Sequence, residues 1–228
     1  MYGSIINSLT IIFGGLIGLM LKKGISERYQ ETIMDGIALV VITIGIINAV
    51  ESKNIILVIS SLVIGSIIGE KVRIDKKLNN LGGFLESKFK KEGSTFTEGF
   101  VSATLVFCVG AMAIVGSLEA GLLSDYNTLI VKSMLDGITS MIFATTLGIG
   151  VLFSSLPVLI YQGSITLLAS SLSSVLTTVV ITEVSAVGGI LIMAIGLSLL
   201  KVKEIRVANM IPAVLIPVIY YFIISLIA

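Results

Sequence analysis

The stretch that decides the fold is residues 137–182, GITSMIFATTLGIGVLFSSLPVLIYQGSITLLASSLSSVLTTVVIT. It holds 46 residues without a single Asp, Glu, Lys or Arg, so no charged side chain in it opposes burial in a membrane. One α-helix of that length would measure about 69 Å, whereas the hydrocarbon core of a bilayer is about 30 Å thick. The stretch therefore predicts two transmembrane helices that fold back on each other.

The reversal is predicted at Ser154-Ser155-Leu156-Pro157. Pro157 lacks an N–H donor and disfavours helix in the residue before it, so a helix is expected to end there. A single span followed by a re-entrant segment is the alternative for this stretch.

The rest of the chain repeats the same pattern. Hydrophobic residues make up 55% of the 228 and charged residues 13%, against about 25% charged in soluble domains. Six further windows without charge are each the size of one span: 1–21, 36–50, 54–69, 99–118, 184–200 and 207–228. The sequence thus predicts an all-α, polytopic transmembrane bundle of about eight spans in one domain, 1–228, with seven spans plus a re-entrant segment as the alternative.

The distribution of basic residues assigns the loops to sides. Loops one, three and seven of the eight-span arrangement hold 13 of the 15 Lys and Arg residues, and only Lys53 and Lys132 fall on the other side. Because cytoplasmic loops carry an excess of Lys and Arg, these loops are expected in the cytoplasm and both termini outside. Omitting one span between 137 and 182 would move loop seven to the outside.

Loop three, residues 71–98, is the only long loop. Leu78, Leu81, Leu85 and Phe89 recur at helical spacing among lysines, which predicts an amphipathic helix at the cytoplasmic interface. Attraction to anionic lipid explains such a loop, and a specific partner site is the alternative.

Two similar segments indicate internal symmetry. TIMDGI at 32–37 and SMLDGI at 133–138 open the second and fifth spans, which would start on opposite faces of the membrane. Spans two to four and five to seven would then form an inverted repeat, an architecture of secondary transporters. Chance similarity between apolar helices is the alternative.

Polar groups inside the membrane are the candidate functional residues, because ionisable side chains there cost at least a few kcal/mol unless they face a cavity or a partner. Asp35 and Asp136 each lie about 6 Å inside the start of a span and each precedes a glycine. They are predicted cation or proton sites near opposite mouths of a pathway. The structural alternative is a carboxylate favoured by the helix dipole, with Lys132 and Asp136 as an ion pair.

Several other polar residues lie in or beside spans. Glu70 at the end of the third span is a candidate whose simpler role is to reach the interface. Asn7, Asn48 and Gln162 can hydrogen-bond helices together or contact a solute. Residues 157–182 also carry many hydroxyl groups, which suit either the lining of a polar pathway or close helix packing.

Several function classes are excluded or disfavoured. The chain has no His and one Cys, so no metal site and no cofactor is expected, and a net charge of +1 argues against nucleic-acid binding. It also lacks the Ser-x-x-Lys, Gly-x-Ser-x-Gly and phosphate-loop motifs, so it is not expected to be an enzyme or an ATP-driven pump.

Four motifs together resemble a known family: FCVGAMAIVGS at 107–117, KSMLDG at 132–137, YQG at 161–163 and SAVGG at 185–189. The similarity extends from residues 7–18 to NMIP at 209–212. The family is the bacterial membrane-protein family called domain of unknown function 554. The resemblance implies an integral inner-membrane protein of a prokaryote, sometimes described as a transporter, without an established substrate.

These observations lead to two hypotheses. The first is a secondary transporter or channel for a small polar solute or cation, a homodimer or higher oligomer in the bilayer, with Asp35, Asp136 and Gln162 near the pathway. The second is a non-transporting scaffold or sensor that binds lipid or protein through loop 71–98.

Overall fold

The structure, a computed structural model, describes residues 1–22, 27–77, 80, 95–109 and 111–227, and the part of the chain so described contains helices and no β-strand. The helices are α1 (Tyr2–Lys22), α2 (Glu27–Val50), α3 (Ile55–Val72), α5 (Thr95–Cys108), α6 (Ala111–Leu122), α7 (Asn127–Leu147), α8 (Gly150–Phe153), α9 (Ser155–Leu167), α10 (Ala169–Leu172), α11 (Thr178–Leu199), the 3₁₀-helix η1 (Val207–Leu215) and α12 (Ile216–Ile227).

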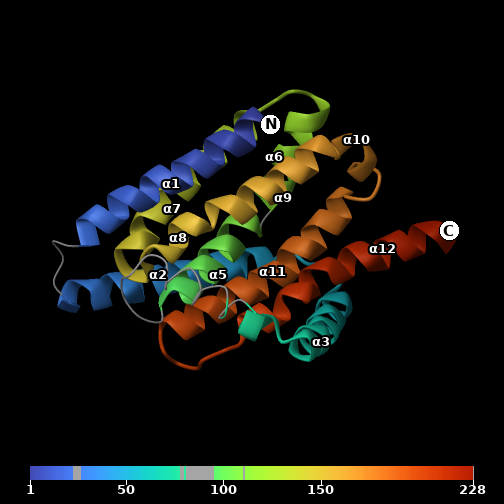
Figure 1. The fold of residues 1–228 in the computed structure, drawn as a ribbon. Coiled ribbons are helices and arrows are strands. Elements are labelled where there is room, and N and C mark those ends of the chain that lie inside the picture. Colours follow the sequence, from blue (N-terminus) through green and yellow to red (C-terminus); the bar gives the residue numbers. More distant parts are fainter. Residues whose placement is uncertain (23–26, 78–79, 81–94, 110, 228) are drawn as a thin grey trace.

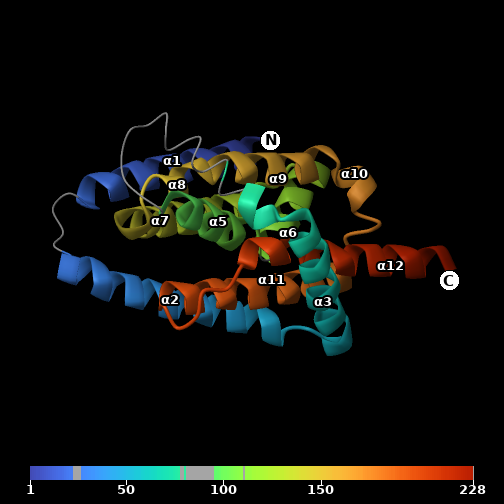
Figure 2. The same cartoon turned by 60° about the horizontal axis from the view of Figure 1, so that its bottom comes forward.

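The long helices form two layers. Figure 2 shows α1, α7 and α9 on one side and α2, α11 and α12 on the other, with α5 and α6 between them and α3 crossing at a steep angle. Figure 1 shows the N-terminus and the far end of α12 toward the same end of the bundle, and the end of α1, the start of α2 and the α11–η1 connection at the opposite end.

The helices have the dimensions of a membrane protein. Among the described residues, seven helices are long and apolar enough to cross a bilayer, and the bent pair α5–α6 would make an eighth. The prediction of an all-α transmembrane bundle is confirmed, with a span count of about eight. The inverted repeat stays a prediction, and most of the predicted interfacial helix falls at 78–79 and 81–94, outside the described residues.

The reversal in the 137–182 stretch lies elsewhere than predicted. α7 ends before Gly148, which adopts φ 73°, a backbone conformation that glycine accepts without steric strain. Pro157 instead lies in the first turn of α9, where a missing N–H breaks no intrahelical hydrogen bond. The placement of the turn at Pro157 is therefore wrong, because a proline begins a helix as readily as it ends one.

The hydroxyl-rich segment is also rearranged. α9 ends at Leu167, so the run of serines that follows belongs to α10 and to the turn before α11. Ser170, Ser171, Ser173 and Ser174 are exposed there. A pathway lined by hydroxyl groups along all of 157–182 is thus not what the chain forms. Only the α9 part, with Gln162 and Thr166, is buried among helices.

Each layer contains a close helix crossing at glycine. A Cβ added at Gly14 of α1 would clash with the carbonyl oxygen of Gly137 in α7. In the other layer, a Cβ at Gly45 of α2 would lie 2.6 Å from the carbonyl oxygen of Gly189 in α11. Small residues let backbones approach in this way when no hydrophobic force drives helices together in lipid.

Two spans are irregular. α5 and α6 meet at a bend of 57°. The last span begins as the 3₁₀-helix η1, which contains Pro212, and continues as α12. Pro212 cannot donate the hydrogen bond that a regular α-helix requires, which accounts for the 3₁₀ start of this span.

Replacing Gly14 by Val should weaken the α1–α7 crossing. The added atoms meet backbone that cannot rotate away, so we expect a loss of about 1–3 kcal/mol in unfolding free energy, measured by thermal unfolding in detergent. Gly36→Val is the matched control, because a Cβ at Gly36 has nothing within 4 Å. Equal melting temperatures for the two variants would contradict the close crossing.

Candidate functional site

A buried ion pair lies on α7. Lys132 Nζ donates to both carboxylate oxygens of Asp136, at 2.9 and 2.8 Å, and Asp136 is only 6% exposed. The four-residue spacing places both side chains on one face of the helix, which points toward α1. The predicted i,i+4 ion pair is confirmed, and it is buried rather than at a solvated helix start.

Two amides extend this pair across three helices. Asn7 Nδ2 on α1 donates to Asp136 Oδ2 at 2.9 Å and to Gln162 Oε1 on α9 at 3.2 Å. Asn7 and Gln162 are both fully buried. We call Asn7, Lys132, Asp136 and Gln162 the polar cluster. It joins three of the residues that the sequence singled out, from positions up to 155 residues apart.

The backbone explains why these side chains meet. Ser4, Asn7, Ser8 and Ile11 recur at helical spacing and form the buried face of α1. Ser140 Oγ on α7 donates to the Ile11 carbonyl at 2.7 Å, just beyond the polar cluster. This interhelical bond and the Gly14–Gly137 contact set the register in which Asn7 faces Asp136.

Four buried polar atoms around the polar cluster have no hydrogen-bond partner. They are Ser4 Oγ, Asn7 Oδ1, Gln162 Nε2 and Thr166 Oγ1. Buried polar atoms are nearly always bonded in proteins, so four unbonded ones on α1 and α9, two helices joined by the Asn7–Gln162 hydrogen bond, are unusual. This set comprises an amide donor, an amide acceptor and two hydroxyls that can do either.

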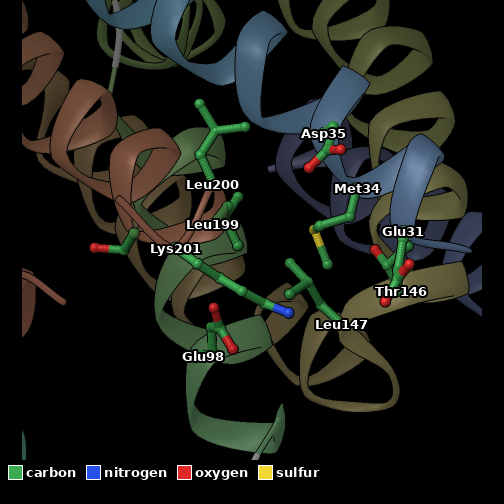
Figure 3. Close-up of a pocket in the computed structure, with 10 residues that line it drawn as sticks. Glu31, Met34, Asp35, Glu98, Thr146, Leu147, Leu199, Leu200 and Lys201 are labelled. Carbon is green, nitrogen blue, oxygen red and sulfur yellow. The ribbon is translucent and has the colours of Figure 1, made fainter. Parts of the chain in front are cut away.

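Asp35 lies apart from the polar cluster, at the other end of the bundle. It is exposed on α2 and lines an open cleft of about 380 Å³. Figure 3 shows Glu31 and Asp35 on one side of this cleft and Glu98 on the other, with Lys201 extending into it near Glu98. The two Asp-Gly elements are therefore not brought together, and their surroundings differ: the Asp35 carboxylate is exposed and the Asp136 carboxylate is buried.

The remaining candidates, Glu70 and Asn48, lie where helices contact one another. Glu70 pairs with Arg206 at 2.7 Å and accepts a hydrogen bond from Asn209 Nδ2, so it ties the end of α3 to η1. Asn48 is partly buried where α2 crosses Gly189 of α11. Neither contacts the polar cluster or lines the cleft at Asp35. Within the described residues, no three of the His, Cys, Asp and Glu side chains gather into a metal-binding group.

Glu183 on α11 was missed by the sequence reasoning. It is fully buried and accepts hydrogen bonds from Ser52 Oγ and from the backbone N–H groups of Lys53 and Asn54, at 2.7, 2.8 and 3.0 Å. Its carboxylate therefore holds the α2–α3 turn and the start of α3. Glu183 is the only charged residue between Asp136 and Lys201, and that isolation in an apolar stretch could have identified it.

Comparison with known proteins agrees with this membrane architecture but supplies no activity. A family model described as "Protein of unknown function (DUF554)" matches residues 2–222. The chain is 40% identical over 229 residues to the uncharacterized membrane protein YdfK of Bacillus subtilis (strain 168), covering 98% of this chain and 97% of YdfK. It is 32% identical over 219 residues to the uncharacterized protein YqgA of Escherichia coli (strain K12), covering 94% and 93%. No solved structure matches it.

Lys132→Met should be more damaging alone than together with Asp136→Asn. The single change leaves a buried carboxylate without its cation, which costs about 3–5 kcal/mol, whereas the double variant leaves no unpaired charge. Thermal unfolding of wild type, both single variants and the double variant completes the cycle. Additive losses would show that the two side chains do not interact.

Glu183→Gln should loosen the α2–α3 turn. A neutral amide makes weaker hydrogen bonds to Lys53 and Asn54 than a carboxylate and presents an N–H group to Ser52, so we expect a loss of about 1–3 kcal/mol in unfolding free energy. Faster amide hydrogen exchange at 52–57 would locate the effect. Glu51→Gln, at an exposed position in the same turn, is the control and should leave both measurements unchanged.

Proposed function

The chain belongs to the DUF554 family of proteins of unknown function, and on that premise we propose that it is a secondary transporter or channel for a small polar solute or cation. The observation that carries the proposal is the polar cluster, a buried set of charged and amide side chains inside helices long and apolar enough to span a bilayer. Ionisable side chains within transmembrane helices are rare, and solute or ion pathways are among the functions that they mark.

The position of the cleft at Asp35 supports the same function. A pathway needs an entrance from water, and this open cleft combines carboxylates with one lysine at the bundle end opposite the N-terminus. The polar cluster lies nearer the N-terminal end. In our proposal Asp35 stands at the mouth of the pathway and the polar cluster lies further along it.

The proposed setting is the cytoplasmic membrane of a prokaryote, with both termini outside. The end of α1, the start of α2 and the α11–η1 connection lie at one end of the bundle, and the N-terminus and the far end of α12 lie toward the other. This arrangement favours an even number of crossings. The excess of Lys and Arg in loops one, three and seven favours a cytoplasmic location for the end of the bundle that holds the α11–η1 connection. Assembly into a homo-oligomer stays a prediction.

Transport is favoured over the other function classes. The sequence has no histidine and no recognisable nucleophile–base motif, so we propose no enzymatic step. A scaffold that acts through loop 71–98 would need no buried ion pair linked to two amides. The scaffold stays the alternative. Variants that lose flux but still bind lipid or protein as the wild type does would favour transport over the scaffold.

Purified protein in proteoliposomes should admit solutes that empty liposomes exclude. We expect faster glycerol-driven swelling, measured by light scattering, or faster uptake of radioactive Rb⁺. Asp35→Asn and Asp136→Asn should each lower that rate by about tenfold, which corresponds to about 1.4 kcal/mol of lost binding or barrier stabilisation.

Asp125→Asn, at an exposed carboxylate in the turn before α7, is the matched control and should transport normally. Size-exclusion profiles establish that each variant is folded, and the double variant Lys132→Met/Asp136→Asn removes the unpaired lysine. Unchanged flux in both single variants would remove these carboxylates from the mechanism. Flux no greater than that of empty liposomes for both probes would count against the proposal for these two solutes.

A further inference from the structure

The charges of the polar cluster cancel. Lys132 Nζ is bonded to both oxygens of Asp136, and Asn7 adds a third hydrogen bond to the same carboxylate. The two charges of the ion pair therefore neutralise each other, and the pair carries no net charge. A bare cation or anion placed beside it would lack a partner for its own charge, which is costly in surroundings of low dielectric constant.

Unlike the ion pair, the two amide side chains each keep a polar atom without a hydrogen bond. Asn7 uses its Nδ2 group within the polar cluster while its Oδ1 is unbonded, and Gln162 uses its Oε1 while its Nε2 is unbonded. Exchanging the oxygen and nitrogen of Asn7 would turn an oxygen toward Asp136 and lose both bonds. One free acceptor and one free donor thus remain at two side chains that are fully buried.

Ser4 and Thr166 add two more unbonded polar atoms, both on the same side of the Asn7–Gln162 pair. α1 and α9 run antiparallel (Figure 1), so Ser4, three residues before Asn7, and Thr166, four residues after Gln162, lie on the same side of the amide pair. Their offsets along the helices are about 4.5 and 6 Å. Both hydroxyl oxygens are buried and unbonded. The row leads toward Met1, which is 40% exposed and whose side chain lies against Gly163.

We propose that Ser4, Asn7, Gln162 and Thr166 bind a small solute without net charge that carries both a hydrogen-bond acceptor and a donor, as a carboxamide does. The solute's acceptor would bond to Gln162 Nε2 and its donor to Asn7 Oδ1, with the two hydroxyls completing its hydrogen bonds. This inference rests on the proposed transport function and narrows its substrate to neutral polar solutes rather than ions.

A series of probes of one size and three charges tests the proposal. Binding of propionamide, propionate and propylammonium to the purified full-length protein in lipid nanodiscs is measured by saturation-transfer NMR and by competition with labelled propionamide. Propionamide should bind at least about tenfold more tightly than either ion, because an ion adds an unpaired charge to a neutral site. Equal binding of the three, or preference for an ion, would overturn the proposal.

The variants locate the binding. Gln162→Leu removes the free donor and should weaken propionamide binding by about tenfold. Ser164→Ala, two residues further along α9 at an exposed hydroxyl bonded to Tyr161, should bind as wild type does. Gln162→Glu keeps the oxygen that accepts from Asn7 but replaces the donor by a second oxygen, so it should also lose propionamide. Unchanged binding in folded Gln162→Leu and Gln162→Glu would refute the assignment.

Binding and flux together separate this inference from the transport proposal. If propionamide binds in a Gln162-dependent way but does not cross proteoliposomes faster than in empty liposomes, the inference stands and transport of such solutes fails. If Rb⁺ crosses in an Asp35-dependent way and propionamide does not bind, transport stands and the neutral-solute inference fails.

Discussion

The low dielectric constant of the interior of the helix bundle is the constraint on which the structure depends. Lys132 and Asp136 can be buried on α7 only as a bonded pair, and Asn7 from α1 donates a further hydrogen bond to the carboxylate. That requirement positions α1 against α7 and brings α9 to the same point through Gln162. Glu183 obeys the same rule in the other layer, where a buried carboxylate gathers three donors from the α2–α3 turn.

Glycine makes these polar contacts possible. Hydrocarbon around the helices provides no hydrophobic drive for them to associate, so their contacts depend on dispersion forces and interhelical hydrogen bonds, both of which require close approach. Gly14 against Gly137 draws α1 and α7 together near the polar cluster, and Gly45 against Gly189 does so for α2 and α11. The positions of small residues thus decide which polar side chains can reach one another.

The apolar pattern and the spacing of charges predicted much of this arrangement. Windows without charge predicted the helical membrane bundle, and the spacing of Lys132 and Asp136 predicted their ion pair. The reversal predicted at Pro157 was misplaced. A residue without an N–H suits the first turn of a helix as well as the end of one, and local sequence does not distinguish the two positions. The hydroxyl-rich segment was assigned to a span because serine is compatible with a helix, a turn and a buried interface alike.

The sequence by itself determined that the chain lies in a membrane as helices, since burial in hydrocarbon follows from composition and from intervals of about 20 residues without charge. It also identified Asn7, Asp136 and Gln162 as unusual one by one, because each is polar in an apolar stretch. Only the tertiary structure decided that these three meet while Asp35 lies apart from them at an open cleft. Such a meeting depends on helix register and crossing, which arise from contacts between residues more than a hundred positions apart.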